Sequence, residues 1–474
     1  MRTLVLGVDS LERWVNGCLV GVVLLLGSAA GQWVTSGVDT LTQTIAGKSL
    51  AMQALAVDST GTLHAVWTER PRAGPGKLLY AYKRPGAAWS EPELVADSAN
   101  NSPVIAVEPG SGIAHIAYVS PIEASGELYY ATNRSGTWER ERLTENSSYD
   151  WTPSIALHNG RVFLAWVIQD STGAYHIACA NNLSGRWKQQ VLTGSELGSF
   201  GLGAAPFLAV GPDGASHISY RGGEYPEYHI HHAENAFPGD TNWRYQVLTT
   251  ANRYDYVSGI AAGGSGELFL VASGNDGWGM QYRTCYLQRP AGDSIWEPYQ
   301  LMTADASALL QGFFQHGGIT HVSWEWINGN VSAENVWHCS NTSGRWYNST
   351  IIADGKTSHG AIVIDPAGCA HCLVLNGTGI DSQQVLCVHS EPFVGVSELN
   401  RQRTACVPPL ICQGILWLET DVRAVLLEQS GRKVMPLHPG RNDASRLASG
   451  VYFVVGLHRH QEGQRALNRV VLVR

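Results

Sequence analysis

The chain has 474 residues, of which 44% are hydrophobic and only 15% charged, and it contains 52 glycines and 16 tryptophans. The ample apolar fraction excludes a disordered chain, and this glycine- and tryptophan-rich mixture favours turn-rich β structure over helices. Residues 31–400 hold 33 acidic and 19 basic side chains, a net charge of −14. This charge excludes nucleic acid as the partner, because phosphate binding requires clustered lysine and arginine.

The first 30 residues predict an export signal. Arg2 and Arg13 precede an apolar run at 18–26, and small residues follow it as far as Ala30. A basic start, an apolar run of about ten residues and small residues at its end are typical of a secretory signal. The run is shorter than the ~20 residues that span a bilayer. We therefore expect cleavage near Ala30 and no transmembrane segment in the mature protein.

Residues 31–397 contain a sevenfold repeat. A five-residue β-prone segment recurs in steps of 51, 48, 54, 52, 52 and 50, and a tryptophan series from Trp89 to Trp346 keeps a similar period. Each unit has four short β-prone runs separated by glycine-rich turns, a pattern typical of antiparallel hairpins. Four strands in about fifty residues, repeated seven times, predict an all-β fold in the form of a seven-bladed β-propeller.

The two ends of the repeat region predict how the ring closes. The seventh unit has no tryptophan strand of its own, whereas Trp33 precedes Trp89 by 56 residues, a step within the range of the tryptophan series. We therefore expect residues 32–40 to form the outer strand of the last blade. Such a strand hides edges that would otherwise be exposed.

The second position of the repeated β-prone segment is interpreted as a packing site. It holds a histidine in five units, which suggests a metal or catalytic ring, but Phe163 and Phe269 occupy it in two others, so an apolar side chain is accepted there. Cys369 and Cys372 suggest zinc, yet strand alternation places them on opposite faces, and two further ligands do not stand out. We expect no metal and no cofactor. The five histidines are His64, His115, His217, His321 and His371.

Three segments, 133–138, 182–187 and 341–346, share the pattern Asn-x-Ser-Gly-x-Trp. This pattern resembles the Asp-box hairpin of sialidase-like propellers, in a form that lacks the defining aspartate. In that family the hairpin is structural, and catalysis depends on an arginine triad, a tyrosine–glutamate pair and an acidic residue. The Arg-Ile-Pro opening of the first catalytic strand is absent here, and no arginine recurs on the inner strands. The resemblance therefore implies the propeller architecture without the sialidase active site.

One face of the predicted propeller carries the candidate ligand-binding residues. The loops between strands two and three and between successive blades emerge on this face, and they are long and variable, as binding loops usually are. Aromatic rings beside carboxylates suit stacking on sugars or gripping an extended peptide; packing against neighbouring blades is the alternative. The candidates are Asp150, Trp151, Arg221, Glu224, Tyr225, Tyr254, Asp255, Tyr256, Asp276, Trp278, Trp324, Glu325 and Trp326.

The chain ends in a linker at 398–414 and a separate domain at 415–474. The linker contains two prolines together with Cys406 and Cys412, a candidate disulfide pair in an exported protein. Segments 425–434, 447–453 and 469–474 resemble, in order and position, the sorting domain of type IX secretion. The resemblance implies a small antiparallel β-sandwich that is read by the secretion machinery, and a protein that is secreted or displayed on the outer-membrane surface of a Gram-negative bacterium.

Two classes of function remain open. One is a non-catalytic surface module that binds or adheres to a glycan or a protein, and the other is a sialidase-like glycoside hydrolase or a lyase. Glycosidases need two carboxyl groups about 5–9.5 Å apart, and the candidate acids lie on different blades, so such a pair is not excluded. The missing arginine triad and the net charge of −14 oppose an anionic sugar substrate. We therefore favour a monomeric binding module, with the hydrolase as the alternative.

Overall fold

The computed structural model of the protein describes most of the repeat region and the strands of the C-terminal region. The predicted export signal and Cys406 lie outside the described residues, and the side chain of Cys412 is not described either. The described residues are 33–43, 48–71, 74–99, 102–121, 126–145, 148–192, 205–224, 227–235, 242–249, 254–275, 282–297, 300–301, 308–316, 319–326, 336–341, 346–352, 357–377, 383–393, 410–412, 415–418, 424–428, 433–438, 440–443, 450–456 and 465–472.

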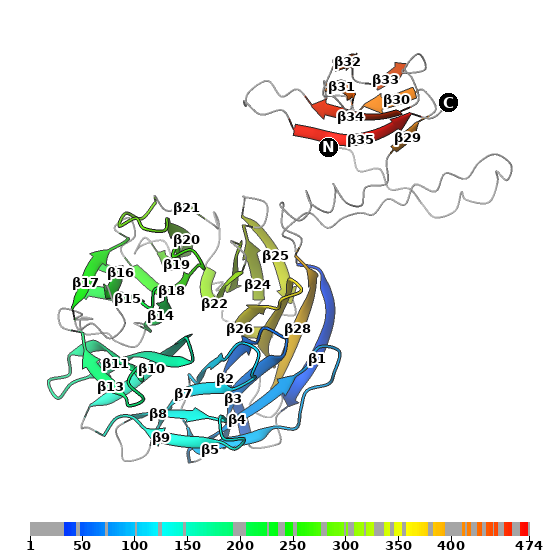
Figure 1. Cartoon of the computed structure of the whole chain (residues 1–474). Helices are drawn as coiled ribbons and strands as arrows, with labels where there is room; N and C mark the ends of the chain where they lie inside the picture. Colours follow the sequence, from blue (N-terminus) through cyan, green and yellow to red (C-terminus); the bar gives the residue numbers. More distant parts are fainter. Residues whose placement is uncertain are drawn as a thin grey trace.

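Seven four-stranded blades stand in a ring, and the described residues contain no helix (Figure 1). The predicted seven-bladed β-propeller is therefore confirmed. The first four blades, each from its innermost strand outward, are β2 (Lys48–Val57), β3 (Leu63–Pro71), β4 (Gly76–Lys83) and β5 (Glu93–Ala99); β6 (Val104–Val107), β7 (Ala114–Ser120), β8 (Glu127–Thr132) and β9 (Glu139–Arg142); β10 (Tyr149–His158), β11 (Arg161–Gln169), β12 (Tyr175–Asn181) and β13 (Lys188–Val191); and β14 (Phe207–Val210), β15 (Ser216–Glu224), β16 (Glu227–Asn235) and β17 (Trp243–Val247).

The remaining three blades complete the ring. They are β18 (Tyr254–Ala262), β19 (Leu268–Asn275), β20 (Tyr282–Arg289) and β21 (Gln300–Leu301); β22 (Ala308–His316), β23 (Ile319–Trp326), β24 (Val336–Ser340) and β25 (Tyr347–Ile352); and β26 (Thr357–Ile364), β27 (Cys369–Asn376), β28 (Gln384–Pro392) and β1 (Thr35–Gln43). Strands within each blade pair antiparallel, as short glycine-rich connections require.

The segments 133–138 and 182–187, which carry the Asn-x-Ser-Gly-x-Trp pattern, form tight turns between the third and fourth strands. The side chain of Asn133 accepts a hydrogen bond of 2.8 Å from the backbone N–H of Ala114, at the start of the second strand, and Asn182 accepts the same bond from Val162. Gly136 has a φ of 88°, which favours glycine because a side chain is strained there. The asparagine therefore ties two hairpins of one blade together.

The N-terminal strand β1 supplies the outer strand of the seventh blade. It pairs antiparallel with β28, with Val38 opposite Val388, over Thr35–Gln43, a range slightly later than the expected 32–40 (Figure 1). Trp33 is 6% exposed and packs against the blade-6 ring of His338. The two ends of the propeller region are thus joined by backbone hydrogen bonds and by apolar packing.

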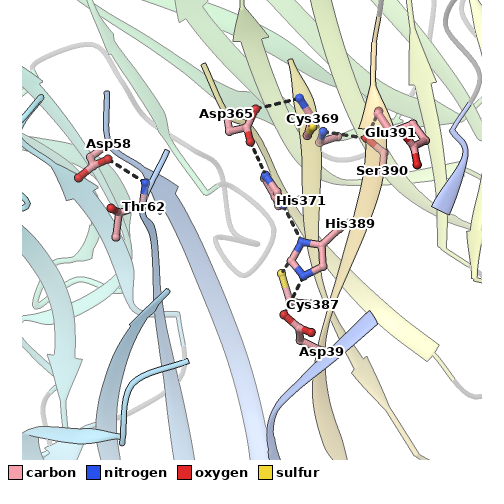
Figure 2. Close-up of polar contacts among 11 residues, drawn as sticks. Asp39, Asp58, Thr62, Asp365, Cys369, His371, Cys387, His389, Ser390 and Glu391 are labelled. Carbon is pink, nitrogen blue, oxygen red and sulfur yellow. Dashed lines mark hydrogen bonds and ion pairs between the residues drawn. The ribbon is translucent and has the colours of Figure 1, made fainter. Parts of the chain in front are cut away.

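A chain of polar contacts crosses the same closure, as Figure 2 shows. His371 Nε2 lies 3.1 Å from Asp365 Oδ2, and its Nδ1 lies 2.7 Å from Nδ1 of His389. His389 Nε2 in turn lies 3.0 Å from Asp39 Oδ2 on β1, and Asp39 also contacts Lys83 of the first blade. The ring closure therefore combines sheet pairing with a continuous line of charged and polar groups.

The hydrophobic core lies between successive blades. In several blades the recurring tryptophan before the outer strand packs edge-to-face on a third-strand ring of the preceding blade. Trp138 packs on Tyr80 at a centroid distance of 4.9 Å, and Trp187 packs on Tyr130 at 5.1 Å. Such aromatic pairs contribute about 0.5–1.5 kcal/mol beyond their buried area. The period of the sequence therefore corresponds to one interface between blades.

The described residues of the C-terminal region form two small sheets. One contains, in spatial order, β29 (Leu410–Cys412), β35 (Arg465–Leu472), β34 (Gly450–Gly456), β31 (Ala424–Glu428) and β32 (Lys433–Leu437), and the other pairs β30 (Ile415–Leu418) with β33 (Gly440–Asp443). A search of the described residues for a helix able to cross a membrane found none.

Candidate functional site

An extended hairpin of blade 4 stands on the predicted loop face, where connections between second and third strands and between blades emerge. Phe207 of the innermost strand pairs with Ser219, and the described β15 continues beyond that point to Glu224, paired with β16. β16 also bridges to the innermost strand of blade 5, with Tyr228 parallel to Tyr254. The hairpin therefore joins blades 4 and 5 at the loop face.

On one side of this hairpin, the imidazole ring of His231 lies against Gly222. The rings of Tyr220 and His231 lie 5.4 Å apart, and a Cβ added to Gly222 would be 2.9 Å from the His231 ring. Burial lowers the pKa of His231, and the neighbouring charge of His229 adds to this effect. The imidazole of His231 therefore favours the neutral form.

The other side of the hairpin carries a cation–π pair. The guanidinium carbon of Arg221 lies 4.7 Å from the ring centroid of Tyr228, and the two residues are 8% and 4% exposed. Such a contact stabilises a guanidinium most when it is removed from water. Arg221, a predicted binding residue, is therefore largely buried. Its side chain lies on the face of β15 opposite to that of Tyr220.

A stacked aromatic pair lies at the start of β10 in blade 3. The rings of Tyr149 and Trp151 are 4.6 Å apart at 26°, and both residues are half-buried. Trp151 also packs on the apolar cluster between blades 3 and 4, which includes Tyr220. The half-exposed pair suits stacking on a sugar ring.

Asp150, between these two aromatic residues, points into the protein. Its carboxylate accepts hydrogen bonds of 2.7 Å from Trp166 Nε1 and 2.5 Å from Thr144 Oγ1, and the residue is fully buried. Burial raises the pKa of Asp150 to about 6. Because Thr144 follows the outer strand of blade 2, this predicted binding residue connects blades 2 and 3.

The structure locates Trp324 within the core as well. It is 3% exposed and stacks on Trp337 of the next strand, with centroids 5.4 Å apart at 13°. For six further predicted residues, the structure describes the backbone, at the loop-face end of a strand, but not the side chain. They are Glu224, Tyr254, Asp255, Tyr256, Glu325 and Trp326. Tyr225, Asp276 and Trp278 lie outside the described residues.

Sequence reasoning missed four residues of this region: Tyr149, Tyr228, His229 and His231. The last three lie in 227–232, where one tyrosine and three histidines stand close together, which is a visible signal. This signal lies inside a strand and not in a loop.

The opposite face, formed by the short hairpins, carries the recurring histidines. His64 and His115 are 2% and 1% exposed, and the Nδ1 atom of His64 lies 2.7 Å from the hydroxyl of Tyr80. His217, His321 and His371 instead contact a second histidine on the third strand. Burial lowers the pKa of His64 and of His321, so both favour the neutral form.

A cavity of about 280 Å³ opens between blades 3 and 4. Phe163, Cys179, Lys188 and Trp243 are among the residues that line it. In blades 1 and 2, a histidine takes the repeat position of Phe163 and a tyrosine takes that of Cys179. Burial raises the pKa of the Cys179 thiol to about 12, which leaves it protonated and unreactive.

No family model matches the chain, and no curated protein matches it. Among solved structures, the chain is similar to a mutant of the α-L-arabinofuranosidase Arb93A from Fusarium graminearum, with 12% identity, a TM-score of 0.42 and coverage of 76% of this chain and 97% of that one. It is similar to the polysaccharide lyase Uly1, with 11% identity, a TM-score of 0.44 and coverage of 73% and 91%. It is also similar to Trypanosoma rangeli sialidase, with 9% identity, a TM-score of 0.43 and coverage of 92% and 89%.

Proposed function

We propose that the protein is a glycoside hydrolase that binds a glycan on the loop face and cleaves it at the junction of blades 4 and 5. The observation that carries the proposal is the parallel bridge between Tyr228 and Tyr254. Glu224 pairs with Glu227, next to Tyr228, and Asp255 follows Tyr254. The backbone thus brings two carboxyl-bearing residues from different blades to one junction, and glycoside hydrolysis uses a pair of carboxyl groups.

The surrounding side chains suit a sugar ligand. Tyr149 and Trp151 offer a stacked, half-exposed aromatic pair near the junction of blades 3 and 4. The half-buried imidazole of His231 lies on the hairpin that bears Glu224. Residues 31–400 carry a net charge of −14, so we expect a neutral glycan to be preferred over a polyanionic one.

Turnover of chromogenic glycosides and of a polysaccharide panel tests the proposal. We expect release of reducing ends, with a loss of about 10²–10⁴-fold in Glu224→Gln and in Asp255→Asn, the range typical of a removed acid or base. Asp97→Asn is the matched control, because this exposed carboxylate lies on the outer strand of blade 1. Its turnover should equal that of the wild type.

The same experiment separates hydrolysis from the alternatives. A glycan array run in parallel measures binding, which Trp151→Ala should weaken by about tenfold, equivalent to about 1.4 kcal/mol. Array binding without turnover on any substrate would make the protein a binding module instead. Formation of unsaturated sugar ends would show elimination and not hydrolysis.

We also propose that the protein is exported and displayed at the cell surface. The support is the basic and apolar pattern of residues 1–30 and the three sorting-domain segments of 415–474. This proposal concerns location alone and stands independently of the enzymatic one.

A further inference from the structure

Three metal-ligating side chains converge on the hairpin face of blade 4. His217 lies on β15, and His232 and Glu234 lie on the neighbouring β16, with one donor atom of each within 4.8 Å of the others. His217 and His232 are 6% and 2% exposed, while the Glu234 side chain keeps 21% of its surface accessible. The group is therefore buried on two sides and reachable from solvent on the third.

Two of the three ligand–ligand distances are close to the edges of a metal coordination tetrahedron. His217 Nδ1 lies 3.3 Å from His232 Nε2 and 3.5 Å from Glu234 Oε2. Zinc–nitrogen and zinc–oxygen bonds of about 2.0–2.1 Å imply ligand–ligand separations of about 3.3–3.4 Å in a tetrahedron. We propose that His217, His232 and Glu234 bind a divalent zinc-class cation, with water from the open side as the fourth ligand.

The types of ligand suit a cation. Two imidazoles and one carboxylate, from His217, His232 and Glu234, form a ligand set that zinc prefers.

Among the described residues, the other blades that carry this histidine lack the convergence. In blade 6, His321 and His338 lie 3.1 Å apart, but Ser340 stands opposite His321 where blade 4 has Glu234. In blade 7, His371 contacts Asp365 through one nitrogen and His389 through the other, so its donors form a line (Figure 2). Within the described residues, blade 4 alone has three such donor atoms within 4.8 Å of one another.

Arg289 of blade 5 supports the carboxylate. Its guanidinium lies 2.7 Å from Glu234 Oε2 and 5.7 Å from the ring centroid of Trp296. Ligating carboxylates are commonly held by a second hydrogen bond of this kind. A bound cation would therefore connect blade 4 with blade 5, on the face opposite the proposed hydrolase site.

Zinc titration of the full, untagged chain after treatment with a chelator tests the site. By calorimetry we expect one tight equivalent of zinc, and saturating zinc should raise the melting temperature. Glu234→Gln should weaken this binding by at least tenfold. Glu108→Gln is the matched control, because Glu108 contacts His115 in blade 2 without a second histidine, and it should bind as the wild type does.

Two results would overturn the proposal. One is the absence of saturable zinc binding by the unmodified chain, and the other is equal affinity in the wild type and in Glu234→Gln. If Glu234→Gln fails to fold, Co²⁺ titration of the unmodified chain decides the matter, because geometry is diagnostic of the ligand set. A tetrahedral visible spectrum supports the site, and an octahedral spectrum refutes it.

Discussion

Trp33 packs against His338 with ring centroids 5.5 Å apart, so the described N-terminal end of the propeller contacts its sixth blade. The backbone N–H of Trp33 also donates a 2.9 Å hydrogen bond to Ser349 Oγ on the outer strand of that blade. This tryptophan therefore anchors β1 before the strand pairs with blade 7.

Replacing this anchor should destabilise the ring. We expect Trp33→Ala to lower the free energy of unfolding by about 3–5 kcal/mol, the usual loss for a buried tryptophan. Val38→Ala on the same strand is the control, because Val38 is 53% exposed and surface changes usually stay within about 0.5 kcal/mol. Chemical unfolding measures both, and equal stability of the two variants would contradict the anchoring role.

Asp150 predicts a pH dependence of stability. Its pKa is raised from 3.8 to about 6 in the folded protein. The folded state therefore binds the proton more tightly, and this contribution to stability is present below the unfolded pKa and lost as the pH rises through about 6. The stability of the wild type relative to Asp150→Asn should be greater at about pH 3.5 than at neutral pH by roughly 3 kcal/mol. Denaturation at the two pH values measures this, and a pH-independent difference would argue against the assignment.

The close approach of Gly222 to His231 predicts that a side chain at position 222 would displace the imidazole. A Cβ in Gly222→Ala would lie 2.9 Å from the imidazole and must displace it. We expect a loss of about 1–3 kcal/mol, typical of overpacking, and altered chemical shifts of the His231 ring. Gly264→Ala is the control, since a Cβ there meets nothing within 4 Å. Wild-type stability in both variants would mean that His231 has room to move.

Removal of residues 415–474 should block export to the cell surface without preventing the propeller from folding. The described strands of this region pair with one another and with β29, and none pairs with a described strand of a blade, so the propeller should fold without them. We expect the truncated protein to remain in the periplasm, as measured by cell fractionation and surface proteolysis. Surface appearance of the truncated protein at the level of the full chain would contradict the sorting role.

The blade number and the closing strand were predictable because they depend on a repeat. Trp33 stands one period before Trp89, and packing of each tryptophan on the preceding blade imposes that period on the sequence. The turn asparagines, such as Asn133, are likewise local features, because they bond within their own blade.

Only the tertiary structure decided which side chains are exposed on the loop face. Asp150 and Trp151 are adjacent, yet one is fully buried by Trp166 and Thr144 while the other remains half-exposed. A bulge between Trp151 and Ser154 shifts the strand alternation here. In the same way, His217 and His321 share one repeat position, and their partners on the third strand determine whether the donors converge. Those partners lie on another strand, so spacing along the chain does not specify them.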